Sequence, residues 1–416
     1  MTAPIRPAVL LGARLQDGRS QDAVAHGVLV TDDRGRIAAA GSSAATAPAD
    51  AQRFDLTGLT VLPGIIDCHV HLALRLEPLH DQVQRSATDI VVRCLQSGRE
   101  FLESGVTTVR DAGYAPAGVK RAFASGAFPG PRTQVSCTPL SQTGGHGDDW
   151  TPSGSVVATE MSDLPPGVAD GPDAVRRAAR FQIRAGADWI KVMASGGVLS
   201  FADSPDASQF TVEEIRVMVE EARAAGIRGT LAHAEGTGGI KNALRAGITS
   251  IEHGDLIDEE GIDLMLERDV PLVPTFNINF SLMDEGRIAR GEVAPWAVEK
   301  MRYLFESQQR NFRHAVERGV RVVMGTDSFA GMYPPAELAY MSQFGLGPFR
   351  AIQAATSEAA KLLGLADVVG TLEAGKQADL IAVSGDPLAE PELWRDPARI
   401  VFVMQGGRVV ADRRGA

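Results

Sequence analysis

The chain reads Val61-Leu62-Pro63-Gly64-Ile65-Ile66-Asp67-Cys68-His69-Val70-His71 where an apolar run ends in two histidines. Residues two positions apart in a β-strand point to the same face of the sheet. The imidazoles of His69 and His71 can therefore reach one metal ion. We expect a buried strand here, with metal ligands at its carboxyl end.

A related local pattern recurs along the chain: an amphipathic helical segment, a glycine or another turn residue, a short β-branched run and then a polar residue. It occurs at residues 103–111, 184–191, 225–233, 245–253, 270–275 and 318–327. Glycine tolerates the left-handed conformation that caps a helix, and continuous apolar strands are typical of a sheet covered on both faces. With strands at 61–66 and 132–137, the chain has about eight strand–helix units, the number that closes a barrel. We predict an α/β fold with a (β/α)8 barrel, or TIM barrel, over residues 59–364.

The two ends of the chain carry hairpin signals. Polar glycine turns separate apolar runs at Gly27–Ile37 and at Ile400–Val410. Neither end has enough strand to be stable alone. We therefore predict one small β-sandwich built from residues 1–58 and 365–416, which brings the two termini together.

Composition argues against several classes of protein. The 416 residues are 44% hydrophobic and can bury a large core, and the formal charge of −11 argues against binding to nucleic acid or to an anionic membrane. No apolar run approaches the ~20 residues that a membrane helix needs. Residues 7–13 are interpreted as a strand and turn rather than as a secretory leader. Because Cys68, Cys94 and Cys137 show no paired spacing, we expect a cytoplasmic protein.

Polar residues follow the predicted strands, at the barrel end where catalytic groups lie. They are His69, His71, Lys191, His233, His253 and Asp327. A single histidine is more often a surface residue than a ligand, but four of the eight histidines fall at strand ends here. Imidazole and carboxylate ligands suit zinc or a similar ion better than calcium or magnesium, which prefer oxygen. The pattern predicts a hydrolytic metal centre.

Lys191 ends a buried strand, where desolvation lowers the pKa of an amine and makes its neutral, nucleophilic form available. A neutral amine can capture carbon dioxide and become a carbamate, an anion that can bridge two cations. With two dications, one carbamate, one carboxylate and one hydroxide, about one positive charge remains, whereas an ammonium group would add about two more. The alternative is a plain ion pair between Lys191 and a nearby carboxylate.

Several stretches together resemble the amidohydrolase superfamily, in the metal-dependent branch similar to Xaa-Pro dipeptidases, zinc carboxypeptidases and imidazolonepropionase-like proteins. They are residues 64–71, 143–148, 190–197, 232–236, 250–254, 325–327 and 370–380. The resemblance covers nearly the whole chain. It is specific for superfamily and fold, and much less so for substrate.

This resemblance implies a binuclear site with two ligand sets and one bridging group: His69, His71 and Asp327 for one ion, His233 and His253 for the other, and carboxylated Lys191 between them. The ions would be zinc, with manganese or cobalt possible, and a hydroxide shared by them would be the nucleophile, since coordination lowers the pKa of water to near 7. Asp327 would accept the proton of the attacking hydroxide and deliver it to the leaving amine.

The resemblance also implies substrate contacts. His146 matches a histidine that lies near the substrate carbonyl or oxyanion, although a histidine in a loop is more often solvent-facing. Ser195, Gly196 and Gly197 could offer backbone donors to the substrate, or form a turn that merely seats Lys191.

Two departures from the family pattern concern the substrate. Many dipeptide-cleaving relatives have a His-Gly pair soon after the last strand's aspartate, which this chain lacks, and Glu235 stands where some relatives have histidine. Both put recognition of a dipeptide carboxylate in doubt. A bulkier or less polar substrate is equally compatible, with Phe329, Met332 and Tyr333 as candidate contacts.

We therefore expect a hydrolase that cleaves an amide bond in an N-acyl amino acid, a dipeptide or a related small molecule. The alternatives are an ester, lactone, phosphotriester or cyclic-amide hydrolase that uses the same site. An imidazolonepropionase would need one metal and no bridging lysine, and a non-catalytic scaffold would have lost ligands. Since relatives often form dimers or rings, we also expect a homo-oligomer.

Overall fold

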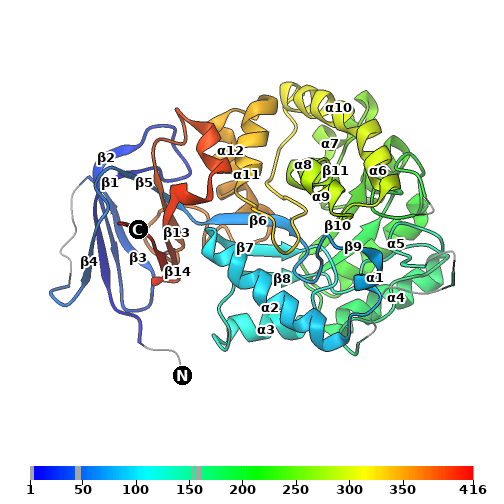
Figure 1. The fold of residues 1–416 in the computed structure, drawn as a ribbon, viewed down its shortest axis with the longest axis horizontal. Helices are drawn as coiled ribbons and strands as arrows, with labels where there is room; N and C mark the ends of the chain where they lie inside the picture. The colour runs from blue at the N-terminus through cyan, green and yellow to red at the C-terminus, as the bar shows by residue number, and fades with distance from the viewer. Residues whose placement is uncertain (1–3, 43–47, 151–152, 155–160, 202, 416) are drawn as a thin grey trace.

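The computed structural model describes residues 4–42, 48–150, 153–154, 161–201 and 203–415. It is a mixed α/β fold whose strands form three sheets. The sheet formed by both ends of the chain lies at one end of the molecule, and the parallel strands with their helices lie at the other (Figure 1).

The largest sheet has the strand order β15-β14-β13-β5-β1-β2-β3, with β4 beside β1. Its strands are β1 (Ala8–Leu15), β2 (Val24–Thr31), β3 (Ile37–Gly41), β4 (Gln52–Asp55), β5 (Leu59–Pro63), β13 (Leu380–Ser384), β14 (Ile400–Gln405) and β15 (Arg408–Asp412). The two predicted hairpins are confirmed, since β2 pairs antiparallel with β3 and β14 with β15. The strand expected near residues 7–13 is also present, as β1.

The two other sheets are parallel, with the orders β6-β7-β8 and β12-β11-β10-β9. Their strands are β6 (Ile65–Val70), β7 (Val106–Asp111), β8 (Arg132–Val135), β9 (Trp189–Met193), β10 (Gly229–Ala234), β11 (Ser250–His253) and β12 (Leu272–Val273). Parallel neighbours need crossover connections, and helices supply them here. Because the strands run in one direction within each sheet, their carboxyl ends lie at the same edge.

Helices follow most of these strands, as the recurring sequence pattern predicts (Figure 1). The α-helices are α1 (Leu79–Gln82), α2 (Ala87–Glu103), α3 (Ala117–Ala124), α4 (Pro172–Ala185), α5 (Val212–Ala224), α6 (Thr237–Ala246), α7 (Glu259–Arg268), α8 (Phe276–Leu282), α9 (Glu285–Ala289), α10 (Pro295–Arg318), α11 (Ala336–Met341), α12 (Pro348–Ala354) and α13 (Ser357–Leu362). A π-helical turn spans Ser342–Leu346, and 3-10 turns span Pro391–Arg395 and Pro397–Arg399.

Glycine caps end three of these helices in the left-handed conformation, as expected. Gly186, Gly247 and Gly319 follow α4, α6 and α10 with φ of 106°, 92° and 95°. A side chain is strained in that region, so glycine stops each helix before the next strand begins.

The strand expected at residues 61–66 is divided at Gly64 between two sheets. Residues before it form β5, in the large sheet, and residues after it form β6, in a parallel sheet. A Cβ on Gly64 would lie 2.3 Å from Oγ1 of Thr107, so only glycine permits this close approach. The apolar run is therefore continuous in sequence but serves two sheets.

The last expected strand, within residues 318–327, is irregular. Isolated parallel bridges join Leu272 to Val322 and Val70 to Ser328 instead of a continuous ladder. Backbone hydrogen bonds from Thr326 and Asp327 to the carbonyl of His69, 3.1 and 2.7 Å long, hold this segment against the end of β6. The irregular segment thus places Asp327 beside His69.

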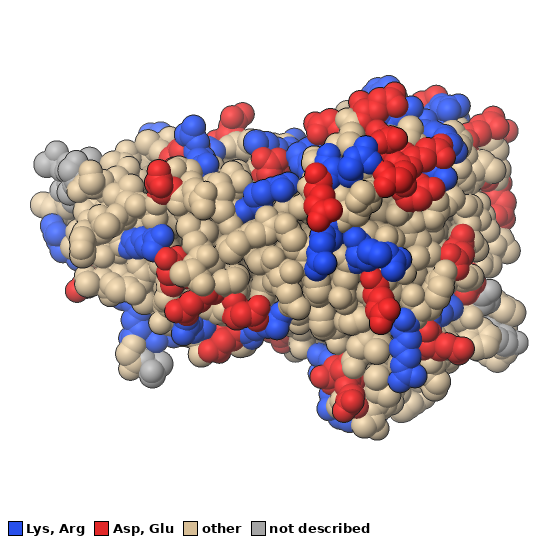
Figure 2. Space-filling model, turned by 90° about the horizontal axis from the view of Figure 1, so that it is seen from above, with Lys and Arg blue, Asp and Glu red and all other residues tan. Residues whose placement is uncertain are grey.

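The surface and the helices bear on possible partners. On the face seen in Figure 2, lysine and arginine are interspersed with aspartate and glutamate. Among the described residues, no helix is both long enough and apolar enough to cross a membrane.

Candidate active site

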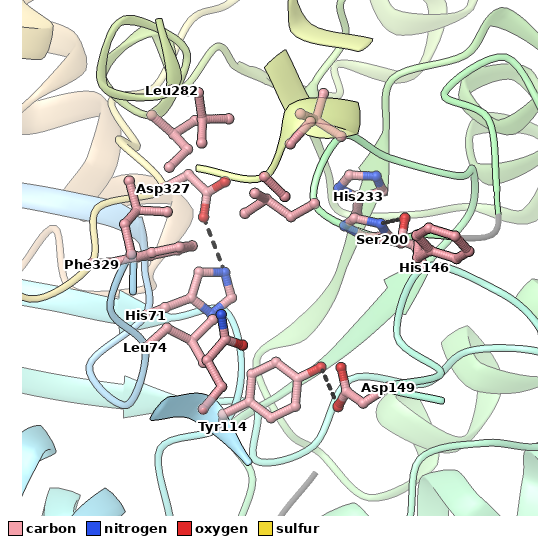
Figure 3. Close-up of a pocket in the computed structure, with 18 of the residues that line it drawn as sticks. His71, Leu74, Tyr114, His146, Asp149, Ser200, His233, Leu282, Asp327 and Phe329 are labelled. Carbon is pink, nitrogen blue, oxygen red and sulfur yellow. Dashed lines mark hydrogen bonds and ion pairs between the residues drawn. The ribbon is translucent and has the colours of Figure 1, made fainter. Parts of the chain in front are cut away.

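His69, His71 and Asp327 meet at the carboxyl end of β6. The Nε2 atoms of His69 and His71 lie 3.6 and 3.1 Å from Oδ1 of Asp327. One ligand atom from each of the three lies within 4.8 Å of the others. The predicted first ligand set is therefore brought together, and Figure 3 shows two of its members, His71 and Asp327.

The hydrogen bonds of these residues favour a cation among them. Nδ1 of His71 lies 3.1 Å from the carbonyl oxygen of Gly113, which can only accept, so a neutral His71 carries its proton there. Its Nε2 then offers a lone pair toward Asp327, whose Oδ1 is buried and has no hydrogen-bond partner among the described residues. Two acceptors at this distance fit a metal ion between them.

Asp327 is held as a carboxylate. Burial alone would raise its pKa, but the imidazoles of His71, His69 and His253 around it keep the pKa below its usual value. The residue also adopts a left-handed backbone conformation, with φ of 51°, which is uncommon for a residue other than glycine. Such strain is typical of functional sites.

A buried ion pair supports His69, and the sequence analysis assigned it no role. Glu252 accepts from Nδ1 of His69 at 2.8 Å, and Arg110 donates to both oxygens of Glu252 at 2.9 and 3.0 Å. Arg110 also donates to the carbonyl oxygen of Cys68. Glu252 lies within residues 250–254, one of the stretches that resemble the family, and is next to His253. A charged residue inside an apolar strand is the sequence signal that could have identified it.

Lys191 lies in the middle of β9, and not at its end as the sequence pattern predicted, and it is 1% exposed. Its Nζ lies 3.3 Å from Nε2 of His69, and the described residues place no carboxylate within ion-pair distance of it. Burial lowers the pKa of Lys191 to about 8, although Glu252 and Asp327 act in the opposite direction. The amine is thus buried beside the first ligand set and more easily deprotonated than an ordinary lysine.

His233 and His253 lie next to this group at the ends of β10 and β11. The ring centroid of His253 lies 5.2 Å from that of His69 and 4.6 Å from that of His233. Burial lowers the pKa of both rings, that of His253 to about 3, so both are neutral and can act as ligands. His253 Nδ1 bonds Thr275 at 2.7 Å, and His233 Nε2 lies 3.0 Å from the Gly196 carbonyl oxygen.

The two predicted ligand sets are not equally well formed. Within the described part of the chain, His69, His71 and Asp327 are the group of three or more His, Cys, Asp or Glu residues close enough to share an ion. The rings of the second set are adjacent, and Nε2 of His233 faces the Gly196 carbonyl oxygen, which leaves Nδ1 with a lone pair, as in His71 the other way round. The donor atoms present fit one ion directly, and the second set offers two ring nitrogens.

His146 stacks on His233, with 4.1 Å between ring centroids and 15° between planes. Its side chain is 15% exposed, so it is not the solvent-facing loop residue of the alternative interpretation. Nδ1 of His146 lies 2.8 Å from Oγ of Ser200. His146 therefore lies in the wall of the site (Figure 3).

A cavity of about 480 Å³ opens over these residues. Beside the six predicted ligands, its wall includes Leu74, Tyr114, Asp149, Leu282, Trp296 and Phe329. Tyr114 donates to Asp149 at 3.5 Å. Such a largely apolar cavity with a few polar groups is typical of a small-molecule site.

The predicted substrate contacts are only partly in this wall. Phe329 is, and its ring packs edge-on against His71 with 5.6 Å between centroids. Met332, Tyr333, Ser195 and Gly196 are not among the described residues that line it. The Met332 sulfur accepts from the backbone of Phe329, and the Ser195 hydroxyl accepts from the backbone of Glu235, so these two residues contact lining residues without lining the cavity themselves.

Comparisons with known proteins agree with this geometry. The profile described as Amidohydrolase family matches residues 60–410. Ochratoxinase of Aspergillus niger is 36% identical over 368 residues, which cover 84% of this chain and 75% of the ochratoxinase.

Solved structures are similar over almost the whole chain. A Xaa-Pro dipeptidase with methionine bound in its active site is 30% identical, with a TM-score of 0.87, and the match covers 97% of this chain and 99% of the dipeptidase. A prolidase in complex with N-methylphosphonate-L-proline is 33% identical, with a TM-score of 0.89 and coverage of 98% and 100%.

Proposed function

The chain belongs to the amidohydrolase family and is a hydrolase acting on carbon–nitrogen bonds, and we propose that it cleaves an amide bond with a binuclear metal centre. The substrate would be an N-acyl amino acid, a dipeptide or a related small amide. The observation that carries the proposal is the buried His69–His71–Asp327 group at the base of the cavity.

The proposed ions are zinc, with manganese or cobalt as alternatives. Divalent ions supply two kinds of chemistry in such a site, acidification of water and polarisation of a carbonyl group. His69, His71 and Asp327 would hold one ion, and His233 and His253 the other. Lys191, as a carbamate, would join the two sets, which its burial and its place beside His69 support.

Asp327 is the proposed proton carrier. Its carboxylate reaches the base of the cavity and its pKa lies below the usual value, so it is ionised and can accept a proton as water attacks the carbonyl. It would then deliver this proton to the nitrogen of the leaving amine. His146, on the opposite side of the site, would contact the substrate.

The cavity supports a small, partly apolar substrate. Leu74, Leu282 and Phe329 form an apolar wall, whereas Tyr114 and Asp149 supply polar groups. The related ochratoxinase and prolidases are named for substrates of different kinds, so the family alone does not choose among amides.

Activity assays test the proposal. Purified enzyme with restored zinc should hydrolyse members of a panel of N-acyl amino acids and dipeptides, and a matched panel of esters and lactones measures the competing reaction. Asp327→Asn should lower kcat by roughly 100-fold or more, since both a ligand and the proton acceptor are lost. Hydrolysis of esters alone, or wild-type turnover by the variant, would refute the proposal.

The proposal also includes the wider architecture. The parallel strands would belong to one (β/α)8 barrel, which the bridges Leu140–Val192 and Val70–Ser328 support, and the sheet of residues 1–58 and 365–416 would form a sandwich domain. We further propose that the protein is cytoplasmic, forms a homo-oligomer and binds a small molecule. It would bind neither nucleic acid nor a membrane surface, and the mixed charges on the face in Figure 2 support this last proposal.

A further inference from the structure

The hydroxyl of Ser200 lies between His146 and two groups that can only accept hydrogen bonds. Its Oγ is 2.8 Å from Nδ1 of His146 and 3.2 Å from the carbonyl oxygen of Gly197, and it makes a short contact with Oδ1 of Asp203. A hydroxyl has one proton to donate, and carbonyl and carboxylate oxygens have none.

This arrangement determines which ring nitrogen of His146 carries a proton. If Ser200 donated to Nδ1 of His146, its lone pairs would face the carboxylate of Asp203 at close range. If it donates to Asp203 instead, its lone pair accepts from a proton on Nδ1. The second arrangement satisfies every atom, so Nδ1 is the protonated nitrogen and Nε2 of a neutral ring keeps a lone pair.

Asp203 is fixed independently of His146. Its side chain is 6% exposed and accepts from Nζ of Lys300 at 3.1 Å and from Nε2 of Gln209 at 3.0 Å. Oε1 of the same Gln209 accepts from the backbone N–H of His146 at 3.0 Å. Lys300 also donates to the carbonyl oxygens of Gly197 and Ser200, at 2.9 and 2.7 Å. Lys300 and Gln209 therefore hold in place both the acceptor, Asp203, and the loop that carries Ser200.

Two neighbours, His233 and Gly197, restrict the position of the His146 ring. His233 stacks on one face, and Gly197 is in contact with the ring. A Cβ on Gly197 would lie 2.3 Å from Cε1 and 2.6 Å from Nδ1 of His146, so only glycine leaves room for the ring. With Nδ1 bonded to Ser200, Nε2 has no partner among the described residues and is the nitrogen left for a ligand.

We propose that Ser200 and Asp203 are positioning residues that hold His146 as the Nδ1–H tautomer, so that Nε2 accepts a hydrogen bond from an N–H group of the substrate. This inference rests on the proposed function, in which His146 contacts the substrate. It predicts a preference for secondary amides, which carry an N–H, over N-methylated amides. The resemblance instead placed the matching histidine near the carbonyl oxygen, where a donor is needed.

The tautomer can be measured without a substrate. In zinc-loaded enzyme labelled with 15N-histidine, His146→Gln identifies the His146 signals, which should report a proton on Nδ1 and none on Nε2. Ser200→Ala removes the acceptor of the proton on Nδ1, so a signal for a proton on Nε2 should then appear. Asp206→Asn, an exposed change in the same segment, should leave the signals unaltered. A proton on Nε2 of His146 in the wild-type enzyme would contradict the proposed roles of Ser200 and Asp203.

The substrate preference is tested with a hydrolysed amide and its N-methyl analogue. Ser200→Ala should lower kcat/KM for the secondary amide by about 10-fold to 100-fold and change the N-methyl rate little, whereas Ser200→Thr should restore the preference. An equal loss on both substrates would mean that Ser200 is merely structural and would contradict the proposal. If no amide were hydrolysed, the proposed function would be wrong. The tautomer measurement would still test the positions of the protons on His146, because it needs no substrate.

Discussion

Nδ1 of His69 and Oε2 of Glu252 lie 2.8 Å apart in the interior, where the two side chains are 1% and 0% exposed. A carboxylate can only accept, so Nδ1 carries the proton and Nε2 is left as the nitrogen that faces Asp327. A histidine oriented by a carboxylate is a common arrangement in metal sites, where the partner fixes the tautomer and raises ligand basicity. Glu252 thus determines how His69 can bind an ion.

Glu252→Gln should weaken metal binding without removing a ligand. Glutamine can keep one hydrogen bond but not the negative charge, and loss of such a partner costs about 10-fold to 100-fold in metal affinity. Competition with a chelator, followed by measurement of bound zinc, gives the affinity. Glu103→Gln is a matched control on the exposed end of α2. Unchanged affinity in Glu252→Gln would show that this carboxylate does not tune the site.

Arg110→Met should destabilise the fold by about 3 to 5 kcal/mol, because it leaves the charge of Glu252 buried without its partner. Urea unfolding followed by circular dichroism measures the change. Arg99→Met breaks the pair with Glu103, which solvent screens, and should change the free energy of unfolding far less. Equal effects of the two substitutions would contradict the role given to burial.

Metal reloading should require bicarbonate and depend on pH through Lys191. Its pKa is lowered from 10.5 to about 8, and only the neutral amine captures carbon dioxide. At pH 7 roughly one tenth of the amine is neutral, against fewer than about one in a thousand for an ordinary lysine. Reloading of chelator-treated enzyme should therefore be faster at about pH 8 than at about pH 6.

The carbamate itself can be observed. Enzyme reloaded with zinc and 13C-bicarbonate should give a carbamate carbon signal that is absent in Lys191→Ala, and the variant should bind fewer zinc equivalents than the wild type. Full activity after reloading in bicarbonate-free buffer, or an unchanged zinc content in the variant, would exclude the bridging role.

Gly197→Ala should reduce turnover more than stability. The added methyl would overlap the ring of His146, which must then move away from Ser200 and the cavity. We expect kcat to fall by about 10-fold or more if His146 assists proton or hydrogen-bond chemistry. Gly118→Ala in α3, where the nearest atom is a flexible carboxylate oxygen at 3.3 Å, provides the control. Wild-type kcat in Gly197→Ala would remove His146 from the mechanism.

Sequence alone predicted the features that depend on local periodicity. The alternation of helices, glycine caps and apolar runs predicted most parallel strands, and the predicted residues His69 and Lys191 do lie together, although Lys191 comes from the middle of β9 and not from its end. Parallel strands align their carboxyl ends whatever the loops do, so these positions follow from the pattern.

The features that sequence did not predict depend on distant contacts. Nothing local to residues 61–66 reveals that Thr107 approaches Gly64 and divides the strand. Ser200 and Asp203 follow β9 in an irregular loop, and only folding brings them to His146. Loop geometry also decides that Phe329 reaches the cavity whereas Met332 and Tyr333 do not line it.

The division of the strand at Gly64 means that the end sheet is no detachable appendage. β13 pairs with β5 through Leu380 and Pro63, and Gly64 itself donates to the carbonyl oxygen of Asp379. One uninterrupted segment then carries the chain from this anchorage to His69. Removing the residues beyond 364 would remove β13, one of the two strands that pair with β5, and would leave His69 less firmly held. A chain truncated in this way should lose its zinc before it loses its helices.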